Sequence, residues 1–259
     1  MELQKLTHEL LTAANEQNQA VRQFVTDAMT VASNIQITSN TAVLAASDMG
    51  AVKAIVAASD VGSQLAKLCN EAADMMNKAA NAAELCSEAG MEIAMLASPI
   101  SSARPLDEMK MISSLLENYN VSSLSGLNSN ERSQIAFSAN DLYQNSEIVF
   151  REIAEAYLKA DDLFEKMEKL NHQLRTSGEL IHALNQTIIK RKSLNPLIPD
   201  DLVALINKAA KDIDDAIALN SPALKLVKTI KTAAGDLSGK SADCLDLATG
   251  LSKSAQTLK

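Results

Sequence analysis

Few residues of this 259-residue sequence could carry acid–base or metal chemistry, because it contains only three histidines. Glu179 and His182 have the Glu-x-x-His spacing that places two ligands on one helix face, as in ferritin-like di-iron bundles. No second copy of this pair occurs, and His172 lies about 80° from His182 around the same predicted helix. We therefore interpret these histidines as solvated helix residues and predict no metal site.

The sequence also lacks the motifs that nucleophilic catalysis and nucleotide binding require. The sequence contains no His-Glu-x-x-His motif, no glycine-rich phosphate loop followed by Lys-Ser/Thr, and no Gly-x-Ser-x-Gly turn. Cys86 and Cys244 fall on apolar stripes without a neighbouring histidine, so they should pack as small hydrophobic residues. We predict that the protein is not an enzyme and uses no cofactor and no small-molecule substrate.

Composition narrows the fold class and the partners. Eight glycines, five prolines and 3% aromatic residues are too few turn and strand formers for a large β fold, which leaves an all-α protein. The net charge of −8 and the scarcity of aromatic residues argue against nucleic-acid binding. Three cysteines without a Cys-x-x-Cys pair fit a reducing compartment. Residues 1–11 have no signal-peptide pattern, so we expect a cytoplasmic location, with non-classical export left open.

The strongest helical signal lies in the second half of the chain. Positions spaced alternately four and three residues apart are apolar at fourteen of sixteen sites, which predicts one long heptad helix over 131–193. These positions are Ile135, Ala139, Leu142, Ser146, Val149, Ile153, Ala156, Ala160, Leu163, Met167, Leu170, Leu174, Ser177, Ile181, Leu184 and Ile188. A second, seven-residue stripe widens the buried face and predicts bundle-core positions at Tyr143, Phe150, Tyr157 and Phe164. Such a helix makes an elongated molecule.

The first 98 residues contain no proline, which predicts a long Ala-rich helix or a helix pair over 1–98. Between Ala51 and Leu96 the alternating spacing continues, and half of its members are alanine. Alanine buries little area but lets helix backbones approach closely, so this stripe requires a partner helix. We predict a self-assembly seam that comprises Ala51, Ala54, Ala58, Val61, Leu65, Leu68, Ala72, Met75, Ala79 and Ala82.

Prolines divide the remaining chain. Pro99 and Pro105 bracket a Ser-rich joint, which predicts a helix break and then a short helix and turn over 99–130. Lys190-Arg191-Lys192 marks the end of the long helix, where the helix dipole favours cations; a patch for an anionic lipid or a partner is the alternative.

A third apolar stripe follows Pro199 and predicts kinked C-terminal helices over 200–259, with phase kept across Pro222. Its members are Leu202, Ile206, Ala209, Ile213, Ala216, Ala223, Val227, Ile230, Ala234, Leu237, Ser241, Cys244, Ala248, Leu251, Ala255 and Leu258. No long linker separates these parts. We predict a single elongated helical domain over 1–259, an antiparallel bundle or coiled coil.

The segment 28–62 has an unusual composition. From Ala28 to Ser47 no residue is charged, and nine are Thr, Ser, Asn or Gln, which is too polar for a lipid-spanning helix. Over 42–62 a small-residue block recurs at an offset of twelve. A helix buried in a bundle or polymer interface explains this pattern. The alternative is conditional membrane contact, with Asp48 and Asp60 protonated at acid pH as the pH sensors.

Short motifs within residues 25–98 resemble those of the Reb proteins that build R-bodies. They are Val25-Thr26-Asp27-Ala28-Met29-Thr30, Met49-Gly50, Asn70-Glu71-Ala72-Ala73, Ala89-Gly90 and Ala97-Ser98. The resemblance implies a protein that polymerises into a coiled ribbon in the bacterial cytoplasm and extends on acidification to break membranes. The long heptad region after Ile135 has no counterpart in that pattern.

Three functions fit these features. The first is a structural protein that self-assembles, as a homo-oligomer or with related helical proteins, through its Ala-rich seams. The second is an α-helical pore-forming toxin component whose 42–62 segment contacts membrane. The third is a cytoplasmic signalling coiled coil, which the prolines at 99, 196 and 222 disfavour.

Overall fold

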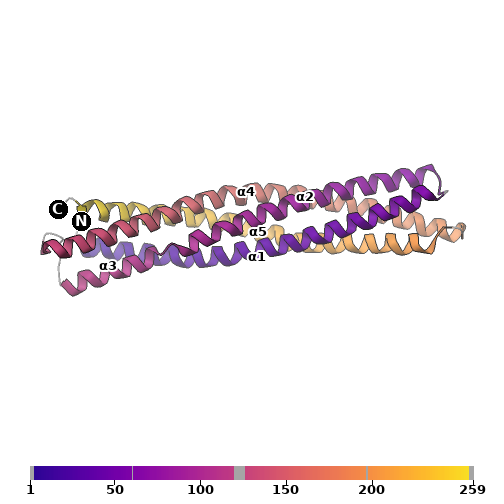
Figure 1. Cartoon of the computed structure of the whole chain (residues 1–259). Coiled ribbons are helices and arrows are strands. Elements are labelled where there is room, and N and C mark those ends of the chain that lie inside the picture. The colour runs from indigo at the N-terminus through magenta and orange to yellow at the C-terminus, as the bar shows by residue number, and fades with distance from the viewer. Residues whose placement is uncertain (1–2, 60, 120–125, 197, 257–259) are drawn as a thin grey trace. The chain divides into compact units, whose positions relative to one another are not determined.

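The computed structural model describes residues 3–59, 61–119, 126–196 and 198–256, and these residues contain helices and no strand. The helices are α1 (Leu3–Ala58), α2 (Ser63–Ser102), α3 (Pro105–Tyr119), α4 (Ser129–Leu194) and α5 (Asp200–Gln256) (Figure 1). Four of them are between 40 and 66 residues long. The predicted all-α class, with very long helices packed antiparallel, is confirmed.

The long helices contribute to two compact units. Unit 1 comprises Met1–Met29, Glu92–Ala160 and Thr229–Lys259, and unit 2 comprises Thr30–Met91 and Asp161–Lys228. The proposal of one domain over 1–259 is not decided by this division and stays a prediction.

Unit 1 has a core to which α1, α3, α4 and α5 all contribute. It includes Leu10 from α1, Met109 from α3, Leu142 from α4 and Leu251 from α5, each fully buried. Within this unit α1 begins and α5 ends at the same end (Figure 1), and Gln17 Nε2 donates a 3.1 Å hydrogen bond to Ser241 Oγ between them. The unit is thus a bundle of antiparallel neighbours.

Unit 2 is built from two helix pairs, each closed by a tight turn. The α1–α2 pair is held by an ion pair of 3.4 Å between Lys53 and Asp74. The α4–α5 pair is held by a 3.0 Å hydrogen bond from Asn185 Nδ2 to Asn207 Oδ1. Because the paired residues lie on either side of each turn, both pairs are antiparallel.

The two heptad stripes predicted in the second half of the chain are confirmed. All sixteen positions of the Ile135–Ile188 stripe are buried, and so are the fifteen described members of the Leu202–Leu258 stripe. Leu258 lies outside the described residues. Mainly apolar residues that keep one heptad phase fix the buried face of a helix, and here they do so for α4 and α5.

A local signal also fixes where α4 begins. Asn128 Oδ1 accepts a hydrogen bond from the Glu131 amide at 3.0 Å, and Glu131 Oε2 accepts one from the Asn128 amide at 2.8 Å. This reciprocal capping box satisfies two backbone donors that the first helical turn leaves unpaired. The predicted helix over 131–193 therefore starts two residues earlier, at Ser129.

The predicted self-assembly seam from Ala51 to Ala82 contains both exposed and buried positions, and its role in assembly stays a prediction. Ala51, Ala54 and Ala58 are exposed, and the buried residues between positions 51 and 58 are Val52 and Val56. Farther on, Val61, Leu65, Ala72 and Ala79 are buried, whereas Leu68, Met75 and Ala82 are half-buried. The chain turns between α1 and α2, with Gly62 at a φ of 85°, so no helical phase crosses residues 59–62.

The predicted break at the prolines lies later than Pro99. This residue is inside α2, which continues to Ser102, and the break falls at Ala103 and Arg104, directly before Pro105. Burial of Ala97 and Ile100 holds this last turn of α2 on the core. Pro105 suits the first position of α3, because the amide that it lacks would have no helical partner there. Pro222 likewise lies inside the continuous helix α5.

The aromatic stripe of α4 lies at the edge of the core rather than inside it. Tyr143, Phe150 and Phe164 are half-buried, and Tyr157 is 37% exposed. The heptad stripe itself fills the centre of the bundle, and the aromatic positions are one residue farther around the helix. They therefore cover seams between helices, as Tyr157 does against Gly235 of α5, whose added Cβ would lie 3.4 Å from the ring.

Candidate interaction surface

The most distinctive surface of unit 2 is the outward side of α1, which carries no charge. All exposed residues from position 30 to position 58 are uncharged, and we call this set the α1 outer face. It comprises Thr30, Ser33, Gln36, Ile37, Asn40, Val43, Leu44, Ser47, Gly50, Ala51, Ala54, Ala57 and Ala58. At 1.5 Å per residue the strip is on the order of 40 Å long.

The two described ionisable residues in this part of α1 are turned toward neighbouring helices. Asp48 is 15% exposed, and its Oδ2 accepts a hydrogen bond from Lys208 Nζ of α5 at 2.5 Å. Lys53 pairs with Asp74 of α2. Hydrogen bonds to Asp48 and Asp212 raise the pKa of Lys208, which keeps this lysine charged. The outer face is uncharged because both ionisable residues of the segment lie on its flanks, where they pair with α5 and α2.

The other helices of unit 2 expose many charges. The exposed surface of α2 within the unit includes six charged residues, and its pattern is typical of a solvated helix. They are Lys67, Glu71, Asp74, Lys78, Glu84 and Glu88. Compared with α2, α1 is distinguished by an exposed side that carries no charge.

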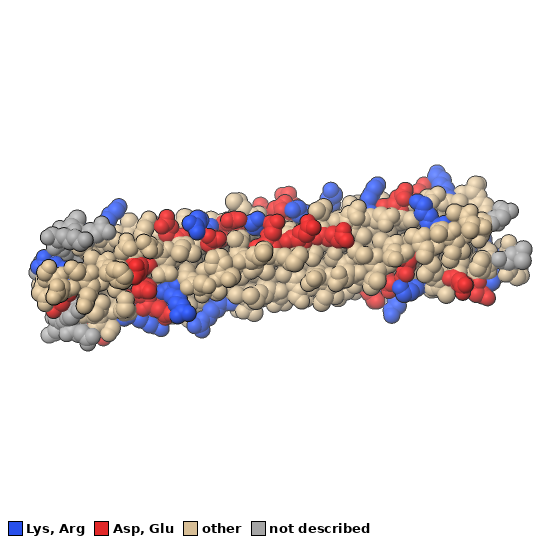
Figure 2. Space-filling view, in the orientation of Figure 1, with Lys and Arg blue, Asp and Glu red and all other residues tan. Residues whose placement is uncertain are grey.

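Three larger apolar residues form the hydrophobic part of the α1 outer face. Ile37 is 48% exposed, Val43 38% and Leu44 56%. Toward the end of the helix the face consists of small residues, which allow a second backbone to approach closely. Figure 2 shows a broad uncharged surface along the course of α1, with the acidic and basic side chains gathered on its flanks.

One described helix is long and apolar enough to cross a membrane by length and composition, and it is α1 over Lys5–Ala58. Only 28% of its most apolar window is buried inside the protein. The core helix of a soluble protein passes the same test, so this property alone does not assign a membrane role.

Of the two predicted pH-sensing residues, the structure places one. Asp48 lies beside the α1 outer face in its ion pair with Lys208, whereas Asp60 lies outside the described residues. The joint role of the two aspartates in pH sensing therefore stays a prediction.

The histidine and cysteine side chains considered above for chemistry lie in contacts that hold the fold. His182 Nε2 lies 2.9 Å from Asp214 Oδ1 and connects α4 to α5. No group of three or more His, Cys, Asp or Glu side chains among the described residues is placed to hold a metal ion. Cys69, Cys86 and Cys244 are buried and unpaired with one another, and burial raises the pKa of Cys86 to about 12.

The basic end of α4 closes both turns of unit 2. Arg191 Nη1 donates a hydrogen bond to the Val61 carbonyl in the α1–α2 turn. Lys192 donates to the Ile198 carbonyl in the α4–α5 turn and pairs with Asp200 at 3.0 Å. The interpretation of these cations as a helix terminus fits this geometry, and their reach into the other turn is a contact that the sequence did not indicate.

No protein-family description matches the chain, and no curated protein or solved structure is significantly similar to it. The resemblance of residues 25–98 to Reb proteins therefore stays a prediction.

Proposed function

We propose that the protein is a non-enzymatic structural protein that pairs with a second copy of itself through the α1 outer face. The observation that carries this proposal is the absence of any charge among the thirteen exposed residues of α1 from 30 to 58. The proposal keeps the predicted Ala-rich self-assembly but moves it to the exposed part of α1, because the α2 part of the seam is largely used within the chain.

Charge favours a second copy as the occupant of this face. Each chain carries a net charge of −8, so two copies repel each other wherever their acidic surfaces meet. Two outer faces meet without this repulsion, and no ion has to be desolvated. Small residues such as Ala51 and Ala54 allow close packing, and Ile37 and Leu44 supply the apolar area.

The size of the strip predicts the strength of the pairing. A strip on the order of 40 Å long and about 10 Å wide gives roughly 400 Å² per chain. A pair then buries roughly 800 Å², below the 1,200–2,000 Å² of stable complexes. We therefore expect a weak dimer that forms at micromolar or higher protein concentration.

Sedimentation velocity over a wide range of protein concentration tests this proposal. The native chain should shift from monomer to dimer as the concentration rises, and Leu44→Glu should weaken the dimer at least tenfold, because it buries a charge in the contact. Leu158→Glu is the matched control, since Leu158 is a leucine of α4 in unit 1 that is exposed at 67%, against 56% for Leu44. A native chain that stays monomeric, or equal effects of the two variants, would refute the proposal.

Membrane contact is the second candidate, and the apolar, largely exposed window of α1 favours it. Lipid would have to accept Ser33, Gln36, Asn40 and Ser47 together with the apolar residues. Burying these polar groups costs free energy in lipid, whereas a second protein surface can offset that cost with hydrogen bonds. Leakage of dye from anionic and neutral liposomes, measured at neutral and acid pH, separates the candidates. Leakage abolished by Leu44→Glu would favour the membrane function, and its absence at both pH values would exclude it.

A further inference from the structure

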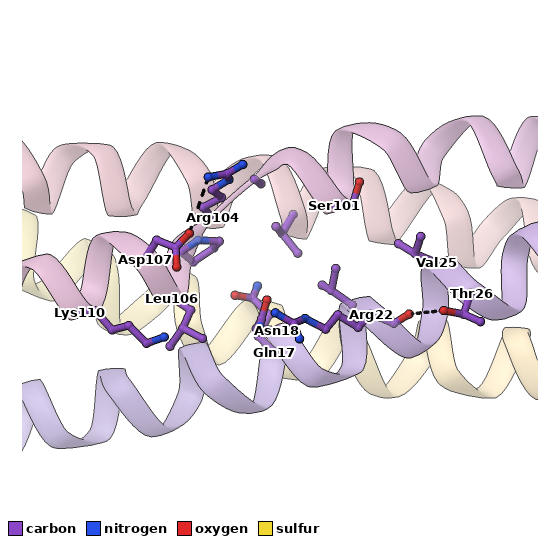
Figure 3. A pocket seen from close by; sticks show the side chains of 14 residues that line it. Gln17, Asn18, Arg22, Val25, Thr26, Ser101, Arg104, Leu106, Asp107 and Lys110 are labelled. Carbon is purple, nitrogen blue, oxygen red and sulfur yellow. Dashed lines mark hydrogen bonds and ion pairs between the residues drawn. The ribbon is translucent and has the colours of Figure 1, made fainter.

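A cavity of about 620 Å³ lies in unit 1, where α1 passes the break between α2 and α3. Side chains of α1 line one side, among them Gln17 and Arg22, and side chains of the break and of α3 line the other, among them Arg104 and Lys110 (Figure 3). The volume is within the range of small-molecule binding sites.

The helix break creates this cavity. Ala103 and Arg104 leave the helical path, and Pro105 then starts α3, so no helical turn covers α1 at this level. Ala103 and Ser101 contribute only short side chains to the wall. An unbroken helix with larger side chains would fill this space.

One hydrogen bond to α4 and several local ones hold the break in place. Asn145 Oδ1 of α4 accepts a hydrogen bond from the Arg104 amide at 3.3 Å, and Asn145 Nδ2 donates to the Asp141 carbonyl at 3.0 Å. The hydroxyls of Ser101 and Ser102 donate to the Ser98 carbonyl at 2.9 and 2.8 Å and close the end of α2. The walls of the cavity are therefore preorganised, which lowers the entropy cost of binding a ligand.

The charge of the lining is opposite to that of the chain. Arg22, Arg104 and Lys110 line the cavity with one acidic residue, Asp107, whose Oδ2 lies 4.0 Å from Arg104 Nη1. The lining thus has a net positive charge, whereas the whole chain is at −8. Cations gathered in one concave site attract an anionic ligand and are stabilised by it.

A buried amide adds a second feature. Gln17 lines the cavity and is 1% exposed; its Nε2 donates to Ser241, and its Oε1 has no hydrogen-bond partner within the described part of the chain. This oxygen is itself buried and an anionic group has no donor for it, so Gln17 is part of the wall and does not hold the ligand. Val21, Val25, Leu106 and Val149 supply an apolar wall beside it.

We propose that this cavity binds a small organic anion, a carboxylate or phosphate group on an apolar body, with Arg22 and Lys110 holding the anionic group. The two side chains approach from different helices, so they bind one group between them, while the valines and Leu106 contact the apolar body. The site is independent of the proposed dimer, because its residues are not part of the α1 outer face.

Isothermal titration calorimetry with three eight-carbon probes tests the site on the full chain. Octanoate and octyl phosphate carry the two candidate anionic groups, and octylamine carries the opposite charge on the same apolar body. We expect one molecule of octanoate or octyl phosphate to bind per chain with a millimolar or lower Kd, and octylamine to bind at least tenfold more weakly. The tighter of the two anions identifies the preferred group.

Substitutions of lining residues test whether the probes bind in this cavity. Arg22→Gln and Lys110→Gln should each weaken the anionic probe about tenfold, because each removes one charged hydrogen-bond donor. Arg175→Gln is the matched control, since Arg175 is an exposed arginine of α4 in unit 2 that does not line the cavity. Absence of binding by both anions, equal binding of octylamine, or equal effects of all three substitutions would overturn the proposal.

Discussion

Two valines of α1 provide a direct test of which side of this helix is buried. Val52 is fully buried and Val43 is 38% exposed, and they lie nine residues apart on one helix. Val52→Ala removes two buried methyl groups, worth about 0.8 kcal/mol each, and leaves a cavity that adds up to about 1 kcal/mol. The better helix propensity of alanine recovers about 0.5 kcal/mol. We expect Val52→Ala to lower the free energy of unfolding by roughly 1–2.5 kcal/mol.

Val43→Ala is the matched control, because it makes the same chemical change at an exposed site. Its partial loss of burial and its gain in helix propensity nearly cancel, so we expect a change within about 0.5 kcal/mol. Urea unfolding followed by circular dichroism, at protein concentrations too low for dimers, measures both values. An effect of Val43→Ala as large as that of Val52→Ala would refute the burial of the Val52 side of α1 and the exposure of its Val43 side.

Three further predictions concern backbone, thiol and carboxyl groups. Gly62→Ala should lower the free energy of unfolding in urea by about 1–2 kcal/mol, because Gly62 has a φ of 85°. Gly50→Ala has nothing within 4 Å of the added Cβ and should raise the free energy of unfolding by up to about 1 kcal/mol. Because burial raises the pKa of Cys86 to about 12, this thiol should resist disulfide reagents at about pH 8 until the protein is unfolded; rapid labelling of the native protein would contradict its burial. Burial and the nearby Asp141 raise the pKa of Glu108, so the folded state holds this proton more tightly and loses stability as pH rises through that pKa. Glu108→Gln should therefore stabilise the protein at neutral pH and give no gain in acid; a gain independent of pH would refute this cause.

How much of the fold the sequence predicts depends on the size of the apolar residues. In α4 and α5 the apolar stripe includes Ile, Leu and Val at intervals along its length, and charged residues occupy the other sides, so only one side of each helix can be buried. In α1, alanine and serine occur on every side, and a stripe can be drawn through Ala51, Ala54 and Ala58 as well as through Val52 and Val56. The larger valines decide the buried side, because each buries more area than alanine.

The candidate surfaces were predictable to different degrees. The uncharged run from Ala28 to Ser47 is visible in the sequence, but its outward side follows only from the buried side of α1 and from the pairing of Asp48 with Lys208. The cavity had one local signal, the Pro99 and Pro105 pair. Contacts that join residues far apart in the sequence, such as those of α1 with the break, depend on helix pairing, which periodicity does not specify.

The α1 outer face also limits the size of the assembly. A single strip that meets the same strip on a second chain forms an isologous contact about a two-fold axis, and this contact closes at the dimer. A ribbon of the kind that the Reb resemblance implies needs a second, different surface on each chain. Sedimentation that stops at the dimer at every concentration, at neutral and acid pH, would therefore support pairing through α1 alone. Species that keep growing with concentration, and that Leu44→Glu does not prevent, would place the assembly contact elsewhere on the chain.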